Sequence, residues 1–242
     1  MSVTWEELGW ERMAAGVGRC RLPGWDCTVG LVVGEGTALL IDAGSSLGEG
    51  ARLRAQAEAF TGHRVTHLAL THPHFDHVFG AAAFAGAEVF GAVGIDTVFT
   101  ARHAREELRA DAVRNGLEAD SADEAIDALV PPRHHVSGEW TLDLGGGRQV
   151  LLANVGPGHT AHDLAVLVPG SPEVVFCGDL VEESGEPQAG ADAVPSHWPA
   201  ALDRLLDLGG EDALYVPGHG AVVDAAFVRA QRDALATRFG VS

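Results

Sequence analysis

Lysine is absent from this chain of 242 residues, and all 16 of its basic side chains are arginines. Enzymes that form a Schiff base, kinases, and phosphate-binding loops ending in Gly-Lys-Ser/Thr all need a lysine, so these classes are excluded. The arginines are outnumbered by 34 acidic residues, which gives a net charge of −18. Because nucleic acids are bound by clustered cations, we expect no nucleic-acid partner.

Long apolar runs and paired cysteines are also missing. No run reaches the roughly 20 residues of a membrane helix, and the N-terminal segment 1–15 is acidic where a secretory signal would be basic. We therefore expect a cytoplasmic protein with no membrane partner. The three cysteines, Cys20, Cys27 and Cys177, include no Cys-x-x-Cys pair. This pattern disfavours both a disulfide framework and a zinc site made of thiolates.

The apolar pattern predicts two groups of strands, each followed by helices. The segment from about 94 to 130 is rich in Ala, Glu, Asp and Arg, which favours a helical insertion. We expect one domain over residues 1–242, of mixed α/β class, with two packed sheets and helices outside them. The expected strands are 28–33, 37–41, 65–70, 88–90, 149–154, 164–168, 173–177 and 213–216, and the other expected helices are 49–60, 78–85, 198–208 and 224–239.

The most informative motif is His72-x-His74-x-Asp76-His77, which follows a predicted strand. Four side chains that bind metals lie within six residues, at a strand end where a loop leads into a helix. Imidazole and carboxylate ligands suit zinc, with iron or manganese as alternatives. Such a turn can direct the first two histidines to one metal and the Asp-His pair to a second metal about 3.5–4 Å away.

Three further ligand-type residues follow strands and have glycine neighbours. They are His159 in Gly-Pro-Gly-His, Asp179 in Cys-Gly-Asp and His219 in Pro-Gly-His-Gly. Glycine lets the backbone turn sharply and approach a metal closely. We predict that His72, His74 and His159 hold one metal, that Asp76, His77 and His219 hold another, and that Asp179 bridges the two.

In this order of motifs, the chain resembles the metallo-β-lactamase fold superfamily of hydrolases, from Ile41-Asp42-Ala43-Gly44 to Gly220. The resemblance implies a four-layer αββα sandwich with a dinuclear metal site at one edge of the sheets. It places Asp42 close behind the metal ligands. It also implies a mechanism in which a metal-bound hydroxide attacks a carbonyl or phosphoryl centre while Asp76 orients the nucleophile and relays its proton.

The branch of the family is narrowed by single residues. A carboxylate at the bridging position, here Asp179, is a feature of the glyoxalase II, lactonase and phosphodiesterase branches that true β-lactamases generally lack. In this respect the chain resembles those branches. The absence of lysine and the short segment after His219 disfavour glyoxalase II, and Leu180 to Glu182 lack the tyrosine of acyl-homoserine lactonases. His74 stands where the redox-active flavodiiron branch has glutamate. We expect hydrolysis of a small-molecule ester, thioester, lactone or related bond. The alternative is a mononuclear iron persulfide dioxygenase on the same fold.

Several other polar residues have two interpretations. His162 and Asp163 either orient His159 or cap the next strand. The loop 185–195 and His197 either cover the metals or only lead into a helix, in which Trp198 packs in the core. His134 and His135 are expected to have solvated or packing roles, and Cys177 to be a small buried residue beside the site.

Overall fold

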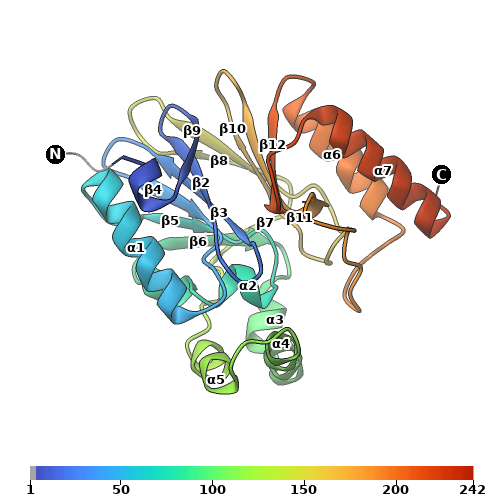
Figure 1. Cartoon of the computed structure of the whole chain (residues 1–242), viewed down its shortest axis with the longest axis horizontal. Coiled ribbons are helices and arrows are strands. Elements are labelled where there is room, and N and C mark those ends of the chain that lie inside the picture. The colour runs from blue at the N-terminus through green and yellow to red at the C-terminus, as the bar shows by residue number, and fades with distance from the viewer. Residues whose placement is uncertain (1–3, 242) are drawn as a thin grey trace.

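Two β-sheets pack face to face in the computed structural model, with helices on the outer faces of both (Figure 1). This arrangement confirms the predicted four-layer α/β fold. The structure describes residues 4–241, so the first three residues of the N-terminal segment considered above lie outside the described residues. Within the described part of the chain, no helix is both long enough and apolar enough to cross a membrane.

The first sheet contains seven strands in sequential order. Its first four strands are antiparallel and its last four are parallel, with β4 in both groups. Because parallel strands end at the same edge, the loops that follow β4, β5 and β6 gather there. The strands are β1 (Glu11–Ala14), β2 (Val17–Arg21), β3 (Thr28–Val33), β4 (Ala38–Ile41), β5 (His67–Ala69), β6 (Glu88–Ala92) and β7 (His134–Val136).

The second sheet has five strands in the order β12-β11-β10-β9-β8. Only β11 and β12 pair in parallel, so both end at the edge that faces the loops of the first sheet. The strands are β8 (Glu139–Asp143), β9 (Gln149–Ala153), β10 (Ala165–Val168), β11 (Val174–Glu182) and β12 (Leu214–His219).

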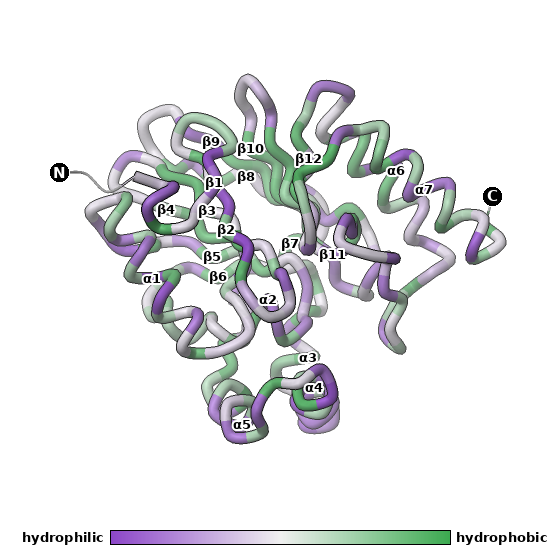
Figure 2. Tube along the Cα trace, in the orientation of Figure 1, coloured by the Kyte–Doolittle hydropathy of each residue, from purple (hydrophilic) through white to green (hydrophobic). Residues whose placement is uncertain are grey.

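The core between the sheets is made of aliphatic and aromatic side chains from both. Ile41 and Phe90 of the first sheet lie in one buried cluster with Phe176 of the second. Each buried side chain of this size contributes roughly 1.5–3 kcal/mol through the removal of apolar surface from water. Gly30 admits the ring of Phe176, because a Cβ at this position would lie 2.5 Å from a ring carbon. Figure 2 shows strands such as β10 and β12 as largely hydrophobic and α4 as largely hydrophilic.

Helix α1 covers the outer face of the first sheet, and α6 and α7 cover the second (Figure 1). Ser46 and Asp224 cap α1 and α7 by accepting a hydrogen bond from a backbone N–H three residues on, as predicted for Asp224. The predicted insertion forms three helices between β6 and β7. The helices are α1 (Leu47–Thr61), α2 (Phe75–Val78), α3 (Asp96–Thr100), α4 (Arg102–Arg114), α5 (Ala119–Asp127), α6 (Trp198–Gly209) and α7 (Ala225–Phe239), with 3-10 turns at Glu6–Leu8 and Ala81–Phe84.

Three expectations about the elements are wrong. The helix expected over 78–85 is instead α2 and a 3-10 turn, because Gly80 between them packs against the backbone of Ala43. Strands β1, β2, β7 and β8 were not predicted, since they are short or carry polar side chains at exposed positions. Strand β11 continues to Glu182, so Asp179 lies within a strand and not at its end.

Two glycines of α1 provide a test of how closely this helix packs. A Cβ on Gly50 would lie 2.2 Å from the carbonyl oxygen of Gly80, whereas one on Gly48 would have only the Ser46 hydroxyl near it, at 3.9 Å. We expect Gly50→Ala to lower the free energy of unfolding by about 1–3 kcal/mol through overpacking. Gly48→Ala serves as the control and should raise it by up to about 1 kcal/mol. Urea denaturation measures both, and equal effects of the two substitutions would contradict this packing.

Candidate metal centre

All seven residues predicted to bind metal lie at one edge of the two sheets. His72 follows β5, and His74, Asp76 and His77 lie before or within α2. Asp179 and His219 lie on the paired strands β11 and β12, whose ends approach α2 (Figure 1). His159 lies in the turn after β9. The fold therefore brings together residues that are up to 147 positions apart, from His72 to His219.

The first group consists of His72, His74, His159 and Asp179, each of which offers one ligand atom within 4.8 Å of the others. The Nε2 atoms of His72 and His159 lie 3.5 and 3.4 Å from Oδ2 of Asp179. Nitrogen ligands about 2.0–2.1 Å from a tetrahedral zinc would be about 3.3 Å apart, so these separations fit one metal. Nε2 of His72 is buried and, among the described residues, has no hydrogen-bond partner. A bound cation would supply the missing partner.

The second group consists of His77, His219 and Asp179, with Asp76 beside them. Nε2 of His77 lies 3.2 Å from Oδ1 of Asp179, and Nε2 of His219 lies 3.2 Å from Oδ2 of the same residue. Asp76 brings its Oδ2 within 3.4 Å of the His219 Nε2 atom. Asp179 Oδ1 is buried and likewise has no hydrogen bond from the described residues. Asp179 therefore lies between the two groups, at the position predicted for a bridging ligand.

Asp42 lies behind the ligands and fixes two of them. Its Oδ2 accepts hydrogen bonds from Nδ1 of His77, at 2.8 Å, and from the Thr71 hydroxyl, at 2.7 Å. The same hydroxyl lies 3.0 Å from Nδ1 of His72. With Nδ1 donating in this way, the Nε2 lone pair of each histidine faces the cluster. Asp42 has a φ of +62°, so its backbone is held in a strained, left-handed conformation at this point.

Two loops orient the remaining histidines. The backbone carbonyl of Gln188 accepts from Nδ1 of His159 at 3.0 Å, and the carbonyl of Trp25 accepts from Nδ1 of His219 at 2.7 Å. In His74 the roles of the two ring nitrogens are exchanged. Its Nε2, and not its Nδ1, has the partner outside the cluster, the Asp192 carboxylate at 3.0 Å. Its Nδ1 then faces Nε2 of His159 across 2.9 Å. In their neutral form, all five histidines would thus present one lone pair to the cluster.

The electrostatics of the cluster suit a cation. Burial lowers the pKa of His159 to about 4, so this ring is neutral at pH 7. Burial alone would raise the pKa of Asp179, but the histidines around it, His77 first, hold that pKa well below its usual range. Burial also acts to lower the pKa of His219, yet the nearby charge of Asp179 raises it to about 9. Ionised carboxylates and imidazole nitrogens are the ligand set that a divalent cation takes, with the release of any proton held there.

Cys27 lies beside the second group, which the sequence did not indicate. Its Sγ is 3.6 Å from Nδ1 and 3.8 Å from Nε2 of His77. Nearly equal distances to both nitrogens place the sulfur beside the ring, away from the direction of the Nε2 lone pair. Burial raises the pKa of this thiol to about 12. Cys27, Asp76 and His77 do offer ligand atoms within 4.8 Å of one another. The position of the sulfur nevertheless favours a packing role for Cys27, and Asp76, His77, His219 and Asp179 remain the predicted second set of ligands.

The glycines next to the ligands are required by space. A Cβ on Gly218 would lie 1.8 Å from Oδ1 of Asp179. Gly178 has a φ of +53°, and a Cβ there would lie 2.8 Å from the side chain of Thr71. At these two positions the backbone approaches a neighbouring side chain so closely that only glycine fits, as predicted.

The residues with two interpretations now have definite places. Asp163 accepts from the backbone N–H and hydroxyl of Thr160, and His162 contacts the Val93 carbonyl, so this pair caps the turn and does not orient His159. Trp198 begins α6 and packs in the core, as predicted, with its ring centroid 5.5 Å from that of His159.

The other histidine and cysteine expectations also hold. His134 stacks on Phe90 and contacts Glu88, His135 is partly exposed, and Cys177 is buried in the core under α6.

The loop 183–197 does reach the metal-binding cluster, through Gln188 and Asp192. The sequence did not identify these residues, nor Trp25 and Thr71, as partners of the ligands. Gln188 and Trp25 act through backbone carbonyls, for which a side chain gives no signal. A search for a carboxylate or hydroxyl next to each histidine would have found Thr71 but not Asp192, which is 118 residues from His74.

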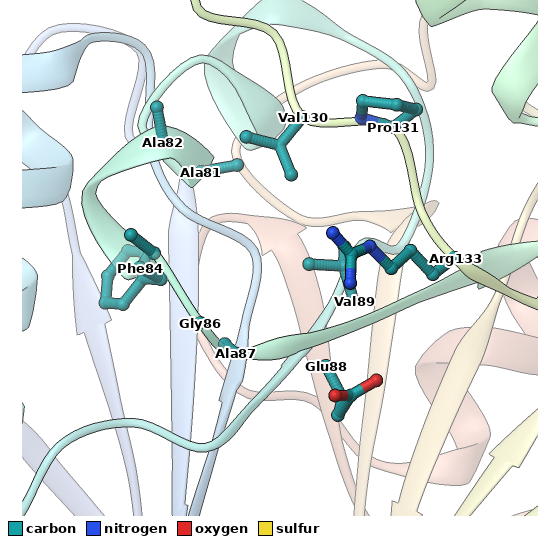
Figure 3. Close-up of a pocket in the computed structure, with 11 residues that line it drawn as sticks. Ala81, Ala82, Phe84, Gly86, Ala87, Glu88, Val89, Val130, Pro131 and Arg133 are labelled. Atoms are coloured by element: carbon teal, nitrogen blue, oxygen red, sulfur yellow. The ribbon is translucent and has the colours of Figure 1, made fainter.

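A separate cavity of about 210 Å³ lies on another part of the surface (Figure 3). It is lined by residues from 81–89 and 130–133, including Phe84, Glu88 and Arg133. None of the seven predicted ligands lines it. We therefore place the chemistry of the protein at the His/Asp cluster and not in this cavity.

Gly218 provides a direct test of the position of Asp179. We expect Gly218→Ala to weaken metal binding by more than tenfold, because the new Cβ must displace the Asp179 carboxylate. Gly138→Ala is the matched control, since a Cβ there would meet nothing within 4 Å. Zinc titration followed by mass spectrometry or atomic emission measures both variants. Unchanged zinc affinity in a folded Gly218→Ala protein would disprove the bridging position.

Asp192 tests the link between the loop and the first group of ligands. Loss of a partner that orients a ligating histidine typically costs about 10–100-fold in metal affinity. We expect Asp192→Ala to lower the affinity of the first metal by that range and Asp192→Asn to lower it less, because an amide oxygen can still accept from Nε2. Asp207→Ala on α6 is the control, and calorimetric titration with zinc is the measurement. An Asp192→Ala protein that titrates like this control would mean that the contact has no effect on the metal.

Known proteins resemble this chain in both sequence and fold. Metallo-beta-lactamase domain-containing protein 1 of Xenopus laevis is 27% identical over 202 residues, which are 81% of this chain and 71% of that protein. The metallo-beta-lactamase of Hirschia baltica has a TM-score of 0.67 at 16% identity, covering 93% of this chain and 96% of its own. The enzyme FIM-1 of Pseudomonas aeruginosa, in its mono-zinc form, has a TM-score of 0.69 at 20% identity, covering 96% of both chains.

The metallo-beta-lactamase of Pontibacter korlensis has a TM-score of 0.69 at 22% identity, over 93% of this chain and 97% of its own. Likeness at these identities shows the fold and does not extend to substrate. The family model of the metallo-beta-lactamase superfamily matches residues 22–219, a range that contains all seven predicted ligands. The chain belongs to the metallo-beta-lactamase superfamily.

Proposed function

We propose that this protein is a hydrolase that binds two divalent cations, zinc first among them, and cleaves an ester, thioester, lactone or related bond of a small molecule. The observation that carries the proposal concerns the three buried side-chain atoms that have no hydrogen-bond partner among residues 4–241: two of them, Nε2 of His72 and Oδ1 of Asp179, lie in the His/Asp cluster, and the third is the Thr28 hydroxyl. Buried polar groups are normally paired, because an unpaired one costs about 1–3 kcal/mol. Both atoms face the other ligands, at the distances given above, so bound cations account for them.

The ligand set supports two cations over one. His72, His74 and His159 form one triplet, and Asp76, His77 and His219 form another, with the Asp179 carboxylate between them. Each cation would have three ligands of its own and would share the Asp179 carboxylate, so a water molecule could bind as a fifth ligand, a coordination number that catalytic zinc can reach. The superfamily to which the chain belongs consists mainly of metal-dependent hydrolases, which agrees with this interpretation.

When bound, two such cations supply hydroxide at neutral pH and polarise the bond to be cleaved. The residues of the chain prepare the site for this chemistry. Asp42, Thr71 and the two carbonyls of Trp25 and Gln188 fix the tautomers of the histidines. Asp76 has its carboxylate at the His219 side of the cluster, 3.4 Å from Nε2. There it can hold the nucleophile by a hydrogen bond and take up its proton, which makes Asp76 the proposed catalytic residue.

The charge of the protein bears on the substrate. Asp192 and Glu182 lie close to the predicted ligands. The protein has a net charge of −18 and contains no lysine. A polyanion would be repelled over most of this surface. We therefore propose a neutral small-molecule substrate that is held by the metals and nearby apolar side chains, and we expect no nucleic-acid or membrane partner.

Metal loading and activity test the proposal together. We expect the wild-type protein to hold two zinc ions per chain, to hydrolyse at least one class in a panel of lactones, thioesters, phosphodiesters and β-lactams, and to lose activity with a chelator. His74→Ala should lower kcat by at least about 100-fold, because the first metal loses one of its three histidines. His103→Ala, at an exposed position on α4, is the control.

The alternative dioxygenase gives a different result in the same experiment. A protein with one iron per chain that consumes oxygen with glutathione persulfide, and hydrolyses nothing in the panel, would contradict the proposed hydrolase. A protein that holds less than one equivalent of metal and is unaffected by chelators would contradict both functions.

A further inference from the structure

Trp25 contacts three parts of the chain that are distant in sequence. Its carbonyl accepts from Nδ1 of His219 at 2.7 Å, and its indole Nε1 donates to the carbonyl of Asn115 at 3.1 Å. Its ring meets Phe75 edge to face, with ring centroids 5.2 Å apart and an interplanar angle of 89°. Phe75 lies between His74 and Asp76 in the metal motif, and Asn115 is the C-cap of α4 in the helical insertion. One residue thus joins a predicted ligand, the metal motif and the insertion.

The loop that carries Trp25 is held in shape by its own contacts. The backbone N–H of Leu22 donates to the carbonyl of Cys27 at 2.8 Å, which closes the loop between β2 and β3. The guanidinium of Arg21 forms two hydrogen bonds with the Asp26 carboxylate. Cys27 also pairs with His219 as a short antiparallel bridge. Because the loop is closed and tied to His219, a displacement of the Trp25 ring is transmitted to the carbonyl that orients this histidine.

The insertion reaches the metal motif by a second route. Leu108 and Ala112 of α4 belong to the same buried apolar cluster as Phe75 and Phe79. The position of α4 is therefore set by packing against the motif on one side and by the Trp25 indole at its C-terminal end. A change in the position of α4 acts on both Phe75 and Trp25, and so on the His219 side of the cluster more than on the His159 side.

From these contacts, we propose that Trp25 is a positioning residue that couples the helical insertion 94–130 to the second metal, the one held by Asp76, His77 and His219. The inference rests on the proposed dinuclear site. It assigns the insertion a role in regulating that site: a substrate that contacts α4 also changes the affinity of the second metal. Coupling of this kind is reciprocal, so binding of the second metal also stabilises the C-terminal end of α4.

Hydrogen exchange measures this reciprocal effect without reference to activity. In the wild-type protein, we expect amide exchange in residues 112–117 to slow when zinc occupies the Asp76/His77/His219 site, and not when it occupies only the His72/His74/His159 site. Trp25→Phe removes the indole N–H and keeps both an aromatic ring beside Phe75 and the backbone carbonyl. In this variant we expect no zinc-dependent change at 112–117, and an affinity for the second zinc that is about two- to tenfold weaker, the range that one hydrogen bond supports.

Trp140→Phe is the matched control, because Trp140 is an exposed tryptophan on β8, with 41% of its surface accessible. It should behave like the wild type in both measurements. A purely structural role of Trp25 would lower stability without removing the dependence of exchange on zinc. If wild-type protein binds two zinc ions and exchange at 112–117 is the same with and without them, the coupling is disproved. If wild-type protein binds fewer than two, the proposed dinuclear function fails instead.

Discussion

The buried carboxylate of Asp179 is the constraint on which the rest of the site depends. Four histidines place a ring nitrogen 3.2–3.5 Å from one of its oxygens. A carboxylate that is out of water needs positive charge or several hydrogen-bond donors, and these rings have already given their second nitrogen to other acceptors. The scaffold therefore holds a concentrated negative charge surrounded by lone pairs. This arrangement is stable only with cations or protons in it, and it explains why glycine is needed at position 218, beside the carboxylate.

The sheets place these residues, and the loops adjust them. Strands β5, β11 and β12 end at the same edge of the sandwich, which brings His72, Asp179 and His219 close together. Fine orientation comes from elements without regular structure: the loop 22–27 acts on His219, and the loop 183–197 acts on His74 and His159. The strands thus determine where the cluster lies, while the two loops hold the outer nitrogens of His74, His159 and His219.

Much of the fold could be predicted because apolar strands and capped helices leave a periodic pattern. The helix ending at Phe239 begins where Asp224 predicts it, since an N-cap is a local interaction. Edge strands such as β8 were missed because only one side of them is buried, and their sequence resembles that of a loop. The helix expected over 78–85 is broken at Gly80 by contact with Ala43, which belongs to another segment of the chain. Contacts of that kind leave no local pattern in the sequence.

The sequence by itself predicted the seven residues of the candidate centre and their division into two groups, because His, Asp and Gly next to the predicted strands have a distinctive order and spacing. Only the tertiary structure decided how four of the five histidines are oriented, because their partners are backbone carbonyls or carboxylates far along the chain, whereas His72 contacts the hydroxyl of its neighbour Thr71. It also decided that Cys27 packs beside His77 without pointing along its lone pair, and that Trp25 joins His219 to the insertion. The physical reason is that ligand identity depends on residue type, whereas ligand geometry depends on which segments the folded core brings into contact.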